Sequence, residues 1–195
     1  RWTETVEDKD IIKKINSVYE HLYDDHRIMD EIYRSVHLPI PRGIHYAMEY
    51  TLGRRLYLAV CDLQNQGFHP RKAGAVTRMM EEAKSFGVEL DRSGVAQFLS
   101  KQLVEAVKRF VTEGGRETIV ICLNIGKLAK RMGIELDRRR AEDDLFFFLK
   151  RLIASPRSIP HEVRSSWDQV VQLAADFRLN PEGLLKAVEK SSTLS

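Results

Sequence analysis

The stretch Ala83-Lys84-Ser85-Phe86-Gly87-Val88-Glu89-Leu90-Asp91-Arg92 recurs in slightly changed form 46 residues further along the chain. The second copy reads Ala129-Lys130-Arg131-Met132-Gly133-Ile134-Glu135-Leu136-Asp137-Arg138. In each copy we expect a helix to end at the glycine, because glycine adopts the left-handed backbone conformation without steric cost. The aspartate that follows is expected to cap the next helix. The repeat therefore predicts two helix-turn-helix hairpins.

Helical spacing extends beyond the repeat. Ile11, Ile15, Val18, Tyr19 and Leu22 recur as on one helix face, and a second helical stretch runs from Ile28 to Val36. The prolines of Leu38-Pro39-Ile40-Pro41 should interrupt the chain before a helix that runs from Arg42 to about Asn65.

A weaker third copy of the repeat spans 174–180, where Phe177 and Leu179 match but no glycine does. A further helix start is expected at Asn180-Pro181-Glu182. These patterns predict an all-α fold, a helical bundle of about seven or eight helices with a duplicated αα-hairpin.

Composition narrows the class of protein. The 195 residues are 43% hydrophobic, and 31 basic against 28 acidic residues leave a net charge of only +3. The two cysteines, Cys61 and Cys122, exclude a disulfide framework and a cysteine-based zinc site. With no long apolar run and no signal peptide, we expect a cytoplasmic protein that does not enter membranes. Because the chain starts with Arg1, we interpret residues 1–195 as a single helical domain from a larger protein.

The residues that could carry chemistry have simpler structural explanations. Glu142, Asp143 and Asp144 could form a catalytic carboxylate pair, but acids in the first turns of a helix also interact favourably with its dipole. The six histidines lack the spacing of a metal-binding helix. We therefore predict no catalytic residue, no metal ligand and no cofactor.

A basic cluster surrounds the second hairpin. It consists of Lys127, Lys130, Arg131, Arg138, Arg139 and Arg140. Lys130, Arg131, Arg138, Arg139 and Arg140 are the candidate anion-binding residues, since cations beside a helix N-terminus can hold a phosphate or a nucleic-acid backbone. The alternative is a solvated charged surface, which we favour.

Three consecutive phenylalanines, Phe146, Phe147 and Phe148, follow this cluster. Successive helix residues are rotated by about 100°, so the three rings cover about 200°, more than a surface helix usually hides. Either the helix is central and all three rings are buried, which we favour slightly, or part of this face is an interface.

Several of these segments resemble one known family. Leu38-Pro39-Ile40-Pro41, followed by Ala47-Met48-Glu49-Tyr50-Thr51-Leu52, is similar to its "LP-P…AAEFVLN" segment. The run 83–92 and the run 133–147, which includes Ala141-Glu142-Asp143-Asp144-Leu145-Phe146-Phe147, resemble its "GLELDLWRAQNLFF" hairpin. This family is the all-helical C-terminal domain of bacterial and archaeal proteins similar to glycoside hydrolase family 57, which are α-amylase- or α-mannosidase-like. The resemblance spans about Tyr33 to Leu152. Arg139 departs from a common tryptophan, and Asp143 and Asp144 from glutamine and asparagine.

The resemblance implies an accessory, non-catalytic domain of an α-glucan-acting enzyme. In that family the catalytic carboxylates lie in an N-terminal (β/α) barrel, so no catalytic residue is carried over, and we expect this chain alone to be inactive. The implied partners are the catalytic barrel of the parent chain and, secondarily, an α-glucan substrate. Two alternatives stay open: a nucleic-acid-binding module that uses the basic hairpin 127–140, and a protein-interaction scaffold that uses the phenylalanine-bearing helix.

Overall fold

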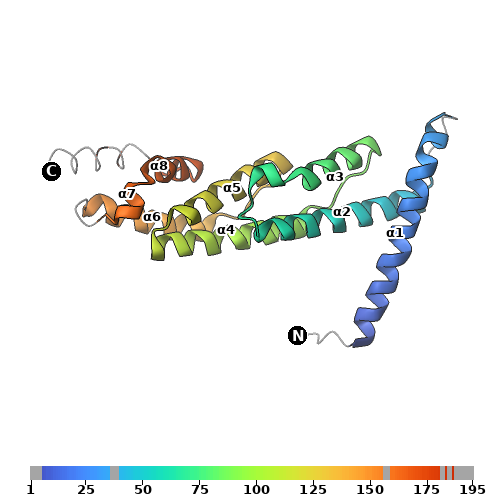
Figure 1. The fold of residues 1–195 in the computed structure, drawn as a ribbon, viewed down its shortest axis with the longest axis horizontal. Coiled ribbons are helices and arrows are strands. Elements are labelled where there is room, and N and C mark those ends of the chain that lie inside the picture. The colour runs from blue at the N-terminus through green and yellow to red at the C-terminus, as the bar shows by residue number, and fades with distance from the viewer. Residues whose placement is uncertain (1–5, 36–39, 156–158, 181–182, 184–185, 187–195) are drawn as a thin grey trace. The chain divides into compact units, whose positions relative to one another are not determined.

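The computed structural model describes residues 6–35, 40–155, 159–180, 183 and 186, and these residues form helices and no strand (Figure 1). The all-α prediction is confirmed. The elements are α1 (Val6–Ser35), α2 (Arg42–Gln64), the short 3-10 helix η1 (Pro70–Lys72), α3 (Gly74–Ser85), α4 (Ser93–Glu113), α5 (Arg116–Met132), α6 (Arg139–Ala154), α7 (His161–Arg164) and α8 (Trp167–Asp176). The two N-terminal helical stretches form one continuous helix, α1. The predicted helix start at Asn180-Pro181-Glu182 and most of the break at 36–39 lie outside the described residues.

The chain divides into two compact units. The first contains residues 1–59 and 74–92, and the second contains residues 60–73 and 93–195, so that α2 contributes to both. Interpretation of residues 1–195 as a single domain stays a prediction. No helix in the described part of the chain is long and apolar enough to cross a membrane.

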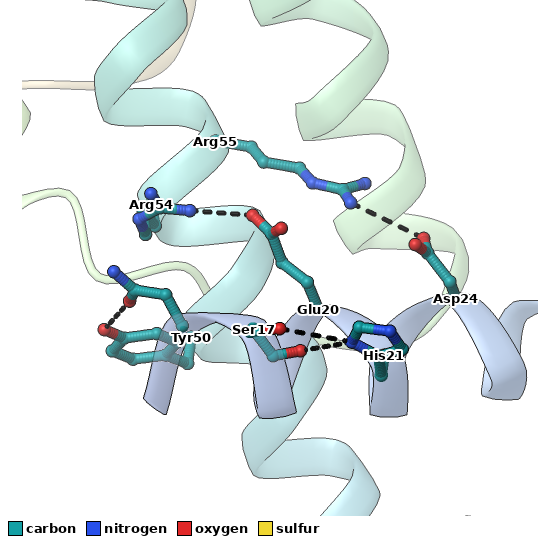
Figure 2. Close-up of polar contacts among 8 residues, drawn as sticks. Ser17, Glu20, His21, Asp24, Tyr50, Arg54 and Arg55 are labelled. Carbon is teal, nitrogen blue, oxygen red and sulfur yellow. Dashed lines mark hydrogen bonds and ion pairs between the residues drawn. The ribbon is translucent and has the colours of Figure 1, made fainter. Parts of the chain in front are cut away.

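In the first unit, α1 is attached to α2 by polar side chains (Figure 2). Tyr50 donates its hydroxyl hydrogen to Asn16 Oδ1 at 2.6 Å, and its ring lies 4.7 Å from that of Tyr19, measured between centroids. One turn further, Arg54 Nη1 lies 2.7 Å from Glu20 Oε1. The face of α1 that contacts its own unit is therefore largely polar.

Two further contacts complete this attachment. Arg55 Nη2 lies 3.5 Å from Asp24 Oδ1, and the Arg55 guanidinium lies 4.7 Å from the centroid of the Tyr23 ring. Tyr23 is fully buried, and its hydroxyl donates to Glu82 of α3. Among the described side chains of α1, Tyr23 is thus the one that is buried.

The second unit has a conventional apolar core. Helix α4 packs against both α5 and α6, and α5 also contacts α8 and η1. The principal neighbour of α6 is thus α4 rather than α5, the helix that precedes it in the predicted hairpin. The residues buried along α4 and α5 include Val95, Leu99, Leu103, Val107, Phe110, Ile119, Cys122, Ile125, Leu128, Ala129 and Met132.

The two predicted turns have the same backbone structure. Gly87 and Gly133 have φ angles of 66° and 63°, as expected for left-handed residues that end a helix. In the first turn the Val88 N–H donates to the Ala83 carbonyl at 2.9 Å, and in the second the Ile134 N–H donates to the Ala129 carbonyl at 2.9 Å. These hydrogen bonds close a Schellman motif at the ends of α3 and α5. The predicted repeat of the turn is confirmed.

The weaker third copy forms the same motif without glycine. At the end of α8 the Leu179 N–H donates to the Ala174 carbonyl at 2.9 Å, and the residue in the glycine position, Arg178, has a φ angle of 56°. Left-handed backbone costs a non-glycine residue about 1–2 kcal/mol. The neighbouring Phe177 is buried, and its burial acts against this cost.

The predicted cap of α6 is wrong by one residue. Arg138 occupies the N-cap position, and its carbonyl accepts the first helical hydrogen bond, from the Glu142 N–H at 2.8 Å. Asp137 precedes it, and its Oδ1 accepts from the Arg139 N–H at 3.3 Å. The aspartate therefore still pairs with a free N–H of the first turn, although the helix begins later than predicted.

Candidate functional site

Helix α6 brings together the phenylalanines and the basic turn. Its inward face consists of Ala141, Leu145, Phe148, Leu149 and Leu152, all of which are buried. Their spacing of four, three, one and three residues is that of a single helix face. This face packs against α4.

Of the three phenylalanines, only Phe148 belongs to the core. Its ring lies 5.0 Å from the Phe110 ring of α4, at an interplanar angle of 71°. Edge-to-face pairs of this kind are favourable beyond the apolar area that they bury. The slightly favoured prediction, in which all three rings are buried within a central helix, is wrong for Phe146 and Phe147.

Phe146 and Phe147 point away from the core. They are 48% and 62% exposed, and their ring centroids lie 5.6 Å apart at 70°. Ile153, seven residues after Phe146 and 41% exposed, falls on the same side of the helix, and the exposed Lys150 lies between them. We name Phe146, Phe147, Lys150 and Ile153 the α6 outer face.

The basic residues separate into different surroundings. Arg138 donates from Nη1 to the Asp176 carbonyl at 2.6 Å, and its guanidinium lies 5.7 Å from the Phe177 ring centroid. Arg138 therefore provides a hydrogen-bond donor for a carbonyl at the C-terminal end of α8. Lys130 and Arg131 are exposed in the last turn of α5.

Arg139 is paired with an acid of its own turn. Its Nε and Nη2 donate to Asp137 Oδ1 and Oδ2 at 3.1 and 3.0 Å, respectively. These side-chain hydrogen bonds from Arg139 hold the pKa of Asp137 below its ordinary value, and the same bonds raise the pKa of Arg139. Arg139 thus has an acidic partner within the turn, although solvent screens this exposed pair.

An open hollow of about 470 Å³ lies at the start of α6. It is lined by Ser100, Lys101 and Val104 of α4 and by Asp137, Arg139, Arg140 and Asp143. The sequence analysis identified Arg139 and Arg140 but not Lys101, whose only signal is its position near the buried Leu99 and Leu103 on α4. Since two carboxylates share this hollow with three cations, its charge is mixed rather than strongly basic.

The other residues considered for chemistry are the acids of α6 and the two cysteines. Glu142 lies in the first turn of α6, where the helix dipole favours an acid, whereas Asp143 and Asp144 follow it in the second turn. Among the residues that the structure describes, no three His, Cys, Asp or Glu side chains are arranged to hold a metal ion. Cys122 is buried, which raises the pKa of its thiol to about 12, whereas Cys61 is half-buried.

The most distinctive surface features of the second unit are therefore the α6 outer face and the mixed-charge hollow at the start of the same helix. In comparisons with known proteins, no family model, no curated protein and no solved structure matches this chain. The interpretation of both features consequently depends on their own geometry.

Proposed function

We propose that this chain is a non-catalytic helical module that docks on another protein domain through the α6 outer face. The observation that carries the proposal is the contrast between adjacent rings, because Phe148 is 7% exposed whereas Phe147 is 62% exposed. Exposed aromatic residues on an ordered helix are typical anchors of protein interfaces.

The anchoring of α6 supports this proposal. Five buried apolar residues fix the helix on α4, so the outward rings are held in place before a partner arrives. A surface that is already ordered loses less conformational entropy on binding. Lys150, in the middle of the α6 outer face, would favour a partner with an acidic group beside an apolar depression.

The resemblance to the family 57-like domains suggests the nature of the partner. It would be the catalytic barrel of an α-glucan-acting enzyme, which this module would stabilise or whose substrate cleft it would shape. The proposal that the module is non-catalytic rests on this resemblance, in which the catalytic carboxylates belong to the barrel.

The nucleic-acid alternative has weaker support. Arg138 is engaged at the end of α8 and Arg139 is paired with Asp137, which leaves Lys127, Lys130, Arg131 and Arg140 as the exposed, unassigned cations of the basic hairpin. Two carboxylates in the adjacent hollow and a net charge of only +3 oppose binding of a polyanion, so any affinity for nucleic acid should be low and should fall as salt is raised.

The test is calorimetric titration of the 195-residue chain with a separately produced family 57 catalytic barrel. Replacing both exposed rings, Phe146→Ser with Phe147→Ser, should weaken binding by at least about 30-fold, the loss typical of an interface hot spot. Tyr46→Ser is the matched control, because Tyr46 is an aromatic residue of α2 that is 64% exposed. It should leave the affinity unchanged.

Two results would contradict the proposal. One is unchanged affinity in the double phenylalanine variant, which would exclude the α6 outer face as the docking surface. The other is α-glucan hydrolysis by the chain alone that disappears in Asp143→Asn or Asp144→Asn, which would make the carboxylates catalytic.

A further inference from the structure

Helix α1 presents a second exposed apolar surface, in the other compact unit. Ile11, Ile15, Val18 and Leu22 are 55%, 44%, 58% and 43% exposed, respectively. We name these four residues the α1 stripe. The sequence analysis recognised their common helix face but not that this face is turned outward.

The α1 stripe cannot turn inward without the loss of specific contacts. Asn16, Glu20 and Asp24, which are four residues apart, hold the other side of α1 through Tyr50, Arg54 and Arg55 of α2 (Figure 2). The buried Tyr23 fixes the same orientation through Glu82. The helix is thus amphipathic in the opposite sense to an ordinary surface helix, with polar groups inward and aliphatic groups outward.

The spacing of the α1 stripe indicates what can cover it. Its members are four, three and four residues apart, which is the alternation of a and d positions along a coiled-coil seam. The spacing is also the same when read from either end. Two identical stripes can therefore interdigitate about a two-fold axis, as a symmetric dimer interface requires.

The length of α1 is sufficient for a weak symmetric contact. Its 30 residues span about 45 Å, so a partner helix about 10 Å wide that follows the whole of α1 covers at most roughly 450 Å² on each copy. The total of at most roughly 900 Å² is below the range of about 1,200–2,000 Å² of stable interfaces and is typical of a weak, transient contact. In the sequence, Met29 and Ile32 resume the same spacing after Asp25.

We infer that α1 is a self-association helix, and that the α1 stripe is covered by the α1 stripe of a second copy of this chain. The contact is independent of the proposed function, because the α6 outer face belongs to the other compact unit. Given its small area, the dimer should form in the micromolar range rather than at nanomolar concentration.

Sedimentation equilibrium of the 195-residue chain, from low micromolar to near-millimolar concentration, tests this inference. The wild-type chain should pass from monomer to dimer. Ile15→Glu with Val18→Glu should weaken dimerisation by at least about 100-fold, because each carboxylate would be buried in an apolar seam. Ser17→Glu adds one charge at an exposed position about 130° around the helix from the α1 stripe and should change the dimer constant far less.

Further variants distinguish a folding defect from the loss of the dimer contact. They also distinguish the α1 stripe from the α6 outer face. Ile15→Ser with Val18→Ser introduces no charge and should weaken dimerisation in the same direction, with an unchanged helical circular dichroism spectrum. Phe147→Ser should leave the dimer constant unaltered. A wild-type chain that stays monomeric throughout, a dimer that survives both double variants, or a dimer abolished by Phe147→Ser would each overturn the inference.

Discussion

Helices α1 and α6 both expose apolar side chains, but they are attached to their units by opposite kinds of contact. Five buried apolar residues hold α6, and its exposed rings are additional to a complete core face. The described contacts of α1 include hydrogen bonds and ion pairs, while the four residues of the α1 stripe face outward. The exposed rings of α6 thus accompany a buried apolar face on the same helix, whereas the α1 stripe lies opposite a face that carries polar contacts.

The largest loss of stability should come from a substitution on the buried side of α6. Phe148→Ala removes a ring that packs on Phe110, and we expect it to lower the free energy of unfolding by about 3–5 kcal/mol. Phe147→Ala, one residue earlier, should change it by no more than about 0.5 kcal/mol, because this side chain is mostly exposed. Urea denaturation of both variants measures the difference. Equal losses would show that the outer ring is also part of a core.

The division between these two rings illustrates what the sequence could determine. Helical spacing, glycine turns and the repeat are local properties, and they correctly predicted the all-α class and the left-handed residues at 87 and 133. The three-phenylalanine arc showed only that one helix carries more apolar surface than it needs. Which ring is buried depends on Phe110 of α4, a contact between residues distant in the sequence.

Similar reasoning explains what the sequence could not determine at the basic turn and on α1. The arginines at 138–140 look equivalent in the sequence, yet one contacts α8, the next pairs with Asp137, and the third lines the hollow. On α1, aliphatic spacing defines a face but not its direction. The polar positions Asn16, Glu20 and Asp24 are equally periodic, and only their partners on α2 show which face is turned inward.

An intermediate loss of stability is expected from a substitution in the turn that leads into α6. Gly133→Val places a β-branched residue at a φ angle of 63° and should destabilise the chain by about 1–3 kcal/mol. Arg178 occupies the equivalent position at a φ angle of 56°, so Arg178→Gly relieves strain there. Part of that gain is offset by the added freedom of glycine in the unfolded chain, which leaves a stabilisation of up to about 1 kcal/mol.

Thermal unfolding of these two variants measures how strongly the backbone of each turn affects stability. The turn at Gly133 determines where α6 begins. Opposite shifts in melting temperature are the expected result. Equal stability of Gly133→Val and the wild-type chain would mean that the turn adapts to a side chain, and that the apolar face alone positions α6.

The smallest effect should come from the polar contacts of α1. Arg54→Ala with Arg55→Ala removes the ion pairs to Glu20 and Asp24 and the cation over the Tyr23 ring. All four charged side chains are partly exposed, so solvent screens the pairs, and the loss should not exceed about 2 kcal/mol. Arg78→Ala, which replaces an exposed arginine of α3 in the same unit, is the matched control.

Hydrogen exchange should report the difference as faster exchange of the α1 amides in the double variant, and raised salt should reproduce part of it in the wild-type chain. If the double variant instead lost as much stability as Phe148→Ala, the ion pairs would be core elements, and α1 and α6 would not differ in how they are held.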